Sequence, residues 1–135
     1  MEHHAIWKDE YALGIKEIDA QHRFFIGLLD QAYTAHYNKD TMENIAVLLE
    51  KIKDYIILHF ETEEKYFDLF NYEFKDEHRE AHNDLKRRFG VLVKRFNDEG
   101  EGTTVDLIDF LENWLLIHLS TVDKKYVACF KEHGL

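Results

Sequence analysis

The segment from Tyr55 to His82, YIILHFETEEKYFDLFNYEFKDEHREAH, contains the two pairs of polar residues that decide the fold. His59 and Glu63 are four residues apart in its first half, and His78 and His82 have the same spacing in its second half. On a helix this spacing puts both members of a pair on one face. Both pairs are in phase with apolar residues, at positions that a helix would bury. The segment therefore predicts two amphipathic helices with polar pairs directed at a common interior.

The complete sequence predicts four long helices joined by short polar connections. Helical periodicity runs over about 19–37, from an N-cap at Thr41 to about 67–71, over about 72–96, and from Thr103 or Thr104 onward, with a short terminal helix at about 123–133. Residues 97–102 form the clearest loop, Thr103-x-x-Asp106 resembles a capping box, and Gly134 is the expected stop of the terminal helix. Short connections favour antiparallel neighbours, which predicts an all-α, up-down-up-down four-helix bundle with a short C-terminal helix.

Composition limits the classes of protein to which the sequence can belong. Its 135 residues predict a single domain spanning 1–135, and the absence of proline suits long, unkinked helices. A net charge of −10 without a basic cluster argues against nucleic-acid binding. No apolar run reaches the roughly 20 residues of a membrane span, and the N-terminus lacks the layout of a signal peptide. We therefore expect a cytoplasmic protein that does not insert into membranes. Cys129, the only cysteine, is expected to be a packed or spare thiol.

Ionisable residues interrupt the apolar stripe of every predicted long helix. They are His22, His59, Glu63, His78, His82, His118 and Asp123. A lone histidine at such a position is usually structural, but seven potential ligands directed at one core indicate a metal centre. Burying Glu63 and Asp123 as unpaired charges would be costly, and a metal cation is the usual compensation.

The types of ligand narrow the choice of metal. Imidazole and carboxylate together suit iron, zinc, copper or nickel better than calcium or magnesium. Seven protein ligands are too many for one ion and suit two. If both carboxylates bridge and a solvent oxygen bridges as well, three histidines complete six-coordination at one ion, and two histidines leave an open position on the other.

The order of these motifs resembles the hemerythrin family, and particularly its single-domain bacterial members, the bacteriohemerythrins. The matching residues are Trp7, Gly14-Ile15, Ile18-Asp19, Gln21-His22, His59-x-x-x-Glu63, His78-x-x-x-His82 and Trp114-Leu115-x-x-His118-x-x-x-x-Asp123. The resemblance implies two non-haem iron ions bridged by Glu63, Asp123 and an oxo or hydroxo group. It assigns His78, His82 and His118 to the coordinatively full iron, and His22 and His59 to the iron that takes O₂. It also implies an apolar O₂ pocket lined by Phe25, Phe60, Trp114, Leu115 and Leu119, with Leu115 as the first candidate.

The function implied by the resemblance is reversible O₂ binding for carriage, storage or delivery, without enzymatic activity. We expect a monomer that passes O₂ to an unidentified oxygen-consuming enzyme. The alternatives are O₂ sensing with a separate partner, a di-iron oxidase, peroxidase or nitric-oxide-handling enzyme, and iron storage. The ratio of five histidines to two carboxylates favours binding over activation of O₂.

Two features do not fit a regular helix with one polar face. His118 and Asp123 are five residues apart, so we expect the last long helix to widen or break near Ser120 and Thr121. His36 falls on the inner stripe of the first helix but matches no expected ligand.

Overall fold

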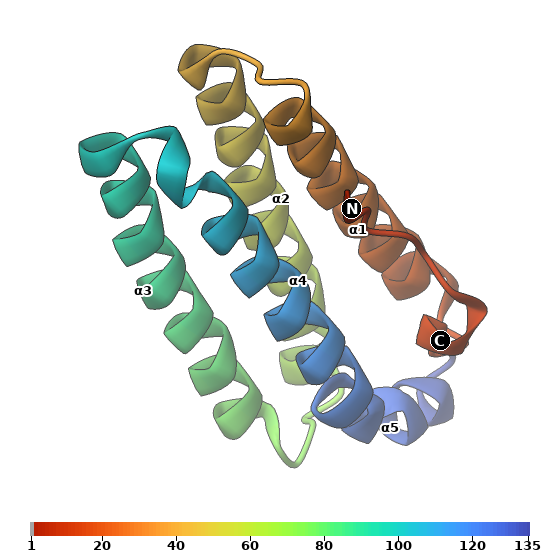
Figure 1. Cartoon of the computed structure of the whole chain (residues 1–135). Helices are drawn as coiled ribbons and strands as arrows, with labels where there is room; N and C mark the ends of the chain where they lie inside the picture. The colour runs from red at the N-terminus through yellow and green to blue at the C-terminus, as the bar shows by residue number, and fades with distance from the viewer. Residues whose placement is uncertain (1) are drawn as a thin grey trace.

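The computed structural model describes residues 2–135, in which every regular element is a helix (Figure 1). The four long helices are α1 (Lys16–Tyr37), α2 (Met42–Leu69), α3 (Lys75–Glu99) and α4 (Thr104–Thr121). Four short ones are the 3₁₀ turns η1 (Asp9–Tyr11), η2 (Glu101–Thr103) and η3 (Asp123–Tyr126) and the helix α5 (Val127–Glu132). These elements confirm the predicted all-α bundle with a short C-terminal helix.

The long helices run alternately up and down, and Figure 1 shows them side by side. Helix α1 packs against α2 and α4, and α3 packs against the same two helices. Each long helix therefore has two neighbours around one central core. In the part of the chain that the structure describes, no helix is both long and apolar enough to cross a membrane.

Two apolar clusters fill the interior, and the polar residues of interest lie between them along the helices. The larger cluster includes Phe25 and Phe60, and the smaller one, at the end of the bundle that α5 covers, includes Ile18 and Phe67. Along α1, His22 lies between Ile18 and Phe25. Along α2, Glu63 lies between Phe60 and Phe67. The sequence periodicity thus produces a buried polar layer with apolar packing on both sides.

A side-chain cap and a left-handed turn explain where two of the helices begin. The Thr41 hydroxyl accepts a hydrogen bond from the Asn44 backbone N–H at 3.1 Å, which confirms the predicted N-cap of α2. Helix α3 begins at Lys75, three residues later than expected, because Asn71 has a left-handed backbone with φ 50° that turns the chain before the helix starts.

The predicted loop at 97–102 and the predicted capping box were wrong in detail. Helix α3 continues to Glu99, since ion pairs with four-residue spacing join Lys94 to Asp98 at 3.7 Å and Arg95 to Glu99 at 2.9 Å. The Thr103 hydroxyl does not cap α4 but donates to the Gly100 carbonyl at 2.9 Å.

The expected break after His118 is confirmed, and the terminal helix is less regular than predicted. Helix α4 ends at Thr121, where the hydroxyls of Ser120 and Thr121 both donate to the Ile117 carbonyl. The first four residues of the predicted helix at 123–133 form η3, and only Val127–Glu132 are α-helical. The change from α to 3₁₀ geometry lets Asp123 and His118 face the same interior.

Candidate metal centre

The seven predicted ligands come from five helical elements and meet in the buried polar layer. Their elements are α1 for His22, α2 for His59 and Glu63, α3 for His78 and His82, α4 for His118, and η3 for Asp123. Each of them is at most 5% exposed. The structure therefore brings together all seven residues that the sequence singled out.

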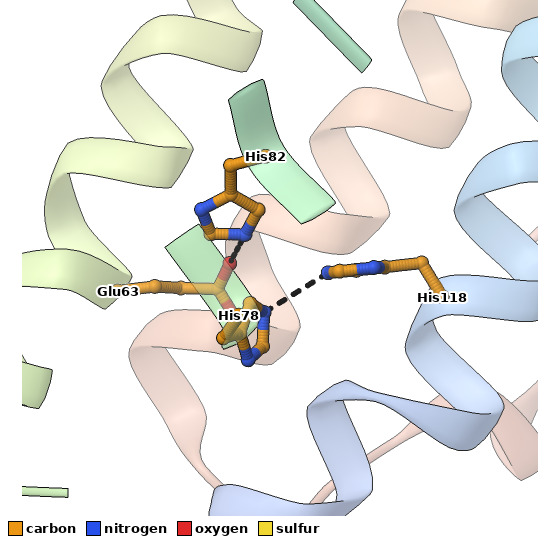
Figure 2. A group of neighbouring side chains, drawn as sticks. All are labelled: Glu63, His78, His82 and His118. Carbon is orange, nitrogen blue, oxygen red and sulfur yellow. Dashed lines mark hydrogen bonds and ion pairs between the residues drawn. The ribbon is translucent and has the colours of Figure 1, made fainter. Parts of the chain in front are cut away.

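Their ligand atoms form two groups. The two-histidine group consists of His22, His59, Glu63 and Asp123. The three-histidine group consists of Glu63, His78, His82 and His118, and Figure 2 shows these four side chains pointing toward one another. Within each group the ligand atoms lie within 4.8 Å of one another. Glu63 belongs to both groups, so the groups adjoin.

The two carboxylates lie between histidines of different groups. Asp123 directs Oδ2 at His22 Nε2, 3.3 Å away, and Oδ1 at His78 Nε2 and His118 Nε2, both 3.0 Å away. Glu63 places Oε1 3.3 Å from His59 Nε2 and 3.2 Å from His82 Nε2. Each carboxylate therefore spans the two groups, as a ligand shared by two cations would.

The imidazole nitrogens also converge in pairs. His22 Nε2 lies 3.0 Å from His59 Nε2, and His78 Nε2 lies 3.0 Å from His118 Nε2. A neutral imidazole carries a lone pair on one nitrogen, and that nitrogen is its metal-binding atom. All five histidines thus direct Nε2 into the polar layer.

The charge states of His59 and of the two carboxylates suit cation binding. Burial lowers the pKa of His59 to about 4, so this imidazole is neutral at neutral pH. Burial and Asp123 act to raise the pKa of Glu63, but His59 and His82 outweigh them and hold it at about 2. Burial also acts to raise the pKa of Asp123, but the histidines around it keep it well below its usual value. Neutral imidazole and ionised carboxylate are the protonation states that bind metal.

Several buried polar atoms of the layer lack the hydrogen bonds that a metal-free core would need. Both carboxylate oxygens of Glu63 and of Asp123 are inaccessible to solvent and make no directional hydrogen bond with the described residues, and the same is true of His82 Nε2. Such atoms are costly to bury. Their convergence, together with the donor types, fits cations held between the two groups.

Two of the predicted pocket residues contact histidines of the layer through their rings. Phe60 stacks on His82 with ring centroids 3.7 Å apart, and Trp114 stacks on His118 at 4.2 Å. Both rings therefore lie against the three-histidine group. Phe25, Phe60, Leu115 and Leu119 are buried, and Trp114 is half-buried.

The sequence patterns assigned no role to two residues that contact ligand histidines. Both contact the histidine at Nδ1, on the side of the ring away from the polar layer. Gln21 Oε1 lies 2.6 Å from His59 Nδ1, and Glu64 Oε2 lies 3.0 Å from His82 Nδ1. Periodicity could not identify them, because Gln21 and Glu64 directly adjoin His22 and Glu63 and do not share their helix face. Their contacts depend on how α1 packs on α2 and α2 on α3.

The two remaining residues of interest lie apart from the layer. His36 is half-buried in the last turn of α1, where its ring centroid lies 5.4 Å from that of Tyr37. Cys129 is half-buried on α5, and burial raises the pKa of its thiol. Neither belongs to the two ligand groups.

Comparisons with known proteins agree with a cation site. The family described as "Hemerythrin HHE cation binding domain" matches residues 13–130. A bacteriohemerythrin of Pseudomonas aeruginosa is 31% identical over 124 residues, covering 92% of this chain and 80% of the relative. A bacteriohemerythrin of Stenotrophomonas maltophilia is 30% identical, covering 95% of this chain and 82% of the relative. One from Clostridium acetobutylicum is 26% identical, covering 90% and 98%.

Proposed function

The chain belongs to the hemerythrin family of HHE cation binding domains, and we propose that it binds O₂ reversibly at a centre of two iron ions. The position of Asp123 carries this proposal. Its two oxygens face histidines of different groups at 3.0–3.3 Å, and neither oxygen has a hydrogen-bond partner in the part of the chain that the structure describes. A buried carboxylate in this position suits a ligand shared by two cations.

The division of the histidines indicates where O₂ would bind. With Glu63 and Asp123 shared, His78, His82 and His118 would complete the ligands of one ion, while His22 and His59 would leave a vacancy at the other. Imidazole and carboxylate suit iron among the metals that such donors bind. Two ferrous ions would supply the two electrons that O₂ takes up on binding and returns on release.

The residues around the layer would keep this binding reversible. Phe25, Leu115 and Leu119 are at most 3% exposed, and they would exclude water from the polar layer. Water and protons admitted beside bound O₂ would promote its irreversible reduction. The protein would therefore supply the metal ligands, hold them in position and keep water out of the polar layer. We expect the O₂ to pass to an oxygen-consuming enzyme.

Iron analysis combined with repeated gas exchange tests the proposal. The purified protein should contain two irons per chain. After reduction it should develop a visible absorption band under O₂ that disappears under argon through several cycles. Azide added to the oxidised protein serves as the control, because it should occupy the same vacancy and produce a band of its own.

Two results would contradict the proposal. One iron per chain, or two zinc ions, would refute the di-iron assignment. Little recovery of the reduced protein after the first cycle would favour an enzyme that consumes O₂ and then needs a reductant.

A further inference from the structure

In each ligand group, one histidine has a hydrogen-bond partner at Nδ1, the ring nitrogen that faces away from the polar layer. The two partners differ in charge. In the two-histidine group, Gln21 Oε1 lies 2.6 Å from His59 Nδ1. In the three-histidine group, Glu64 Oε2 lies 3.0 Å from His82 Nδ1. The Nδ1 atoms of His22 and His78 are buried without such a partner among the described residues. The support is thus specific to one imidazole in each group.

The hydrogen bonds behind His59 run in one direction. Thr62 donates its hydroxyl proton to the Leu58 carbonyl at 3.0 Å, so its oxygen is free to accept from Gln21 Nε2 at 3.2 Å. The amide oxygen of Gln21 then accepts from His59 Nδ1–H. This arrangement leaves His59 Nε2 unprotonated, with its lone pair directed into the polar layer.

The support behind His82 is anionic. Arg79 Nε lies 3.5 Å from Glu64 Oε1, and the Arg79 guanidinium also pairs with Asp68 at 2.6 Å. A carboxylate can only accept, so His82 Nδ1 carries the proton and Nε2 its lone pair. Arg79 holds the carboxylate in place.

We propose that Gln21 and Glu64 are positioning residues that give the two ligand groups different electron-donating power. A carboxylate behind an imidazole makes it a stronger donor than a neutral amide does. The three-histidine group should therefore stabilise the higher oxidation state of its cation more than the two-histidine group does. This inference rests on the proposed function in that it requires a cation in each group.

Zinc-loaded protein tests the positioning role without iron or O₂. Nitrogen NMR should show that His59 and His82 carry protons on Nδ1 and bind zinc through Nε2. Q21L and E64L should each release zinc about 10–100-fold faster than the unaltered protein. E64Q keeps an oxygen acceptor and should restore slow release. Release at the unaltered rate from both leucine variants, or protons on Nε2, would overturn the positioning role.

The iron-loaded protein tests the difference in charge. E64Q removes a negative charge behind His82 and should raise the midpoint potential, whereas Q21E adds one behind His59 and should lower it. E61Q is the matched control, because Glu61 is an exposed carboxylate on the same helix and undergoes the same change of charge. Its potential should equal that of the unaltered protein.

The outcomes separate this inference from the proposed function. Shifts in the same direction for E64Q and Q21E, or an E61Q shift as large as that of E64Q, would refute the charge asymmetry. Neither result would affect reversible O₂ binding. Conversely, the protein could bind zinc as described and yet not recover during the gas cycles. The positioning role would then stand, and reversible O₂ binding would be refuted.

Discussion

At the residue scale, Leu115 offers a direct test of the apolar cover. It is 2% exposed on α4, one turn before His118. Leu115→Ala should speed conversion of the O₂-binding form to the inert diferric form, because the cavity admits water to the polar layer. The rate can be followed from the decay of the visible band in air.

Leu107→Ala is the matched control for this experiment. Leu107 is 1% exposed on the same helix but lies three turns from His118. Both substitutions should lower the free energy of unfolding by about 2–5 kcal/mol, and only the change at Leu115 should speed the decay. Equal decay rates in the two variants would place Leu115 outside the cover.

Tyr33 permits a second prediction, independent of metal. Its ring is fully buried, and its hydroxyl donates to Asp109 Oδ1 at 2.5 Å. Tyr33→Phe leaves the carboxylate without this donor, so the free energy of unfolding should fall by about 1–3 kcal/mol. Urea titration at neutral pH measures the change.

The same tyrosine predicts a dependence on alkaline pH. Burial, with Asp109 and Glu112 adding to it, raises the pKa of Tyr33 well above its ordinary value of 10.0. Above pH 10 the unfolded chain loses this proton while the folded protein keeps it, so the stability from Tyr33 is present below pH 10 and decreases as the pH rises. The decline should be shallower in Tyr33→Phe. Parallel curves for the two proteins would show that Tyr33 is not the group responsible.

At the scale of the elements, two glycines should respond to alanine in opposite directions. Gly90 lies inside α3, and a Cβ added there would meet nothing within 4 Å. Gly90→Ala should raise the free energy of unfolding by about 0.5–1 kcal/mol, because glycine in a helix loses more backbone entropy on folding. Thermal and urea unfolding would both register the gain.

Gly14 is the contrasting position, just before α1. Its φ is +81°, and an added Cβ would lie 2.7 Å from Lys131 Nζ. Gly14→Ala should cost about 1–2 kcal/mol, since a side chain is strained in left-handed backbone. Stabilisation by both alanines would mean that residue 14 adopts ordinary helical or extended geometry in solution.

At the scale of the whole molecule, metal should bind the four long helices together. Glu63 and Asp123 are fully buried, and their oxygens have no hydrogen-bond partners within residues 2–135. Removing metal should therefore lower the melting temperature, because a cation that binds only the folded state stabilises it by about 2.7 kcal/mol at 100 times its Kd. Calorimetry with and without metal measures the difference.

A double variant controls for effects unrelated to the site. The combination of Glu63→Gln and Asp123→Asn removes both shared carboxylates, so its melting temperature should respond little to metal. Identical melting of the unaltered protein with and without metal would contradict a structural role for cations in the bundle.

The sequence alone was sufficient to predict the four helices and the seven convergent residues. Helical periodicity is local, and a four-residue spacing such as that of His78 and His82 places both side chains on one face wherever the helix packs. The five-residue step from His118 to Asp123 likewise predicted a break, because no regular helix could align them. Helix ends were predicted less well, since pairs such as Arg95 and Glu99 extend α3 into an otherwise loop-like sequence.

Only the packing of the helices determined which of those residues lie between the two ligand groups and which side chains form hydrogen bonds with the ligand histidines. The placement of the two Asp123 oxygens between His22 and His78 depends on the directions of α1, α3 and η3 relative to one another. The contact of Glu64 with His82 depends in the same way on the packing of α2 against α3. Such contacts join side chains far apart in the chain. Spacing along one helix sets the face on which a residue lies, but the distances between atoms on different helices arise from the tertiary packing of the core.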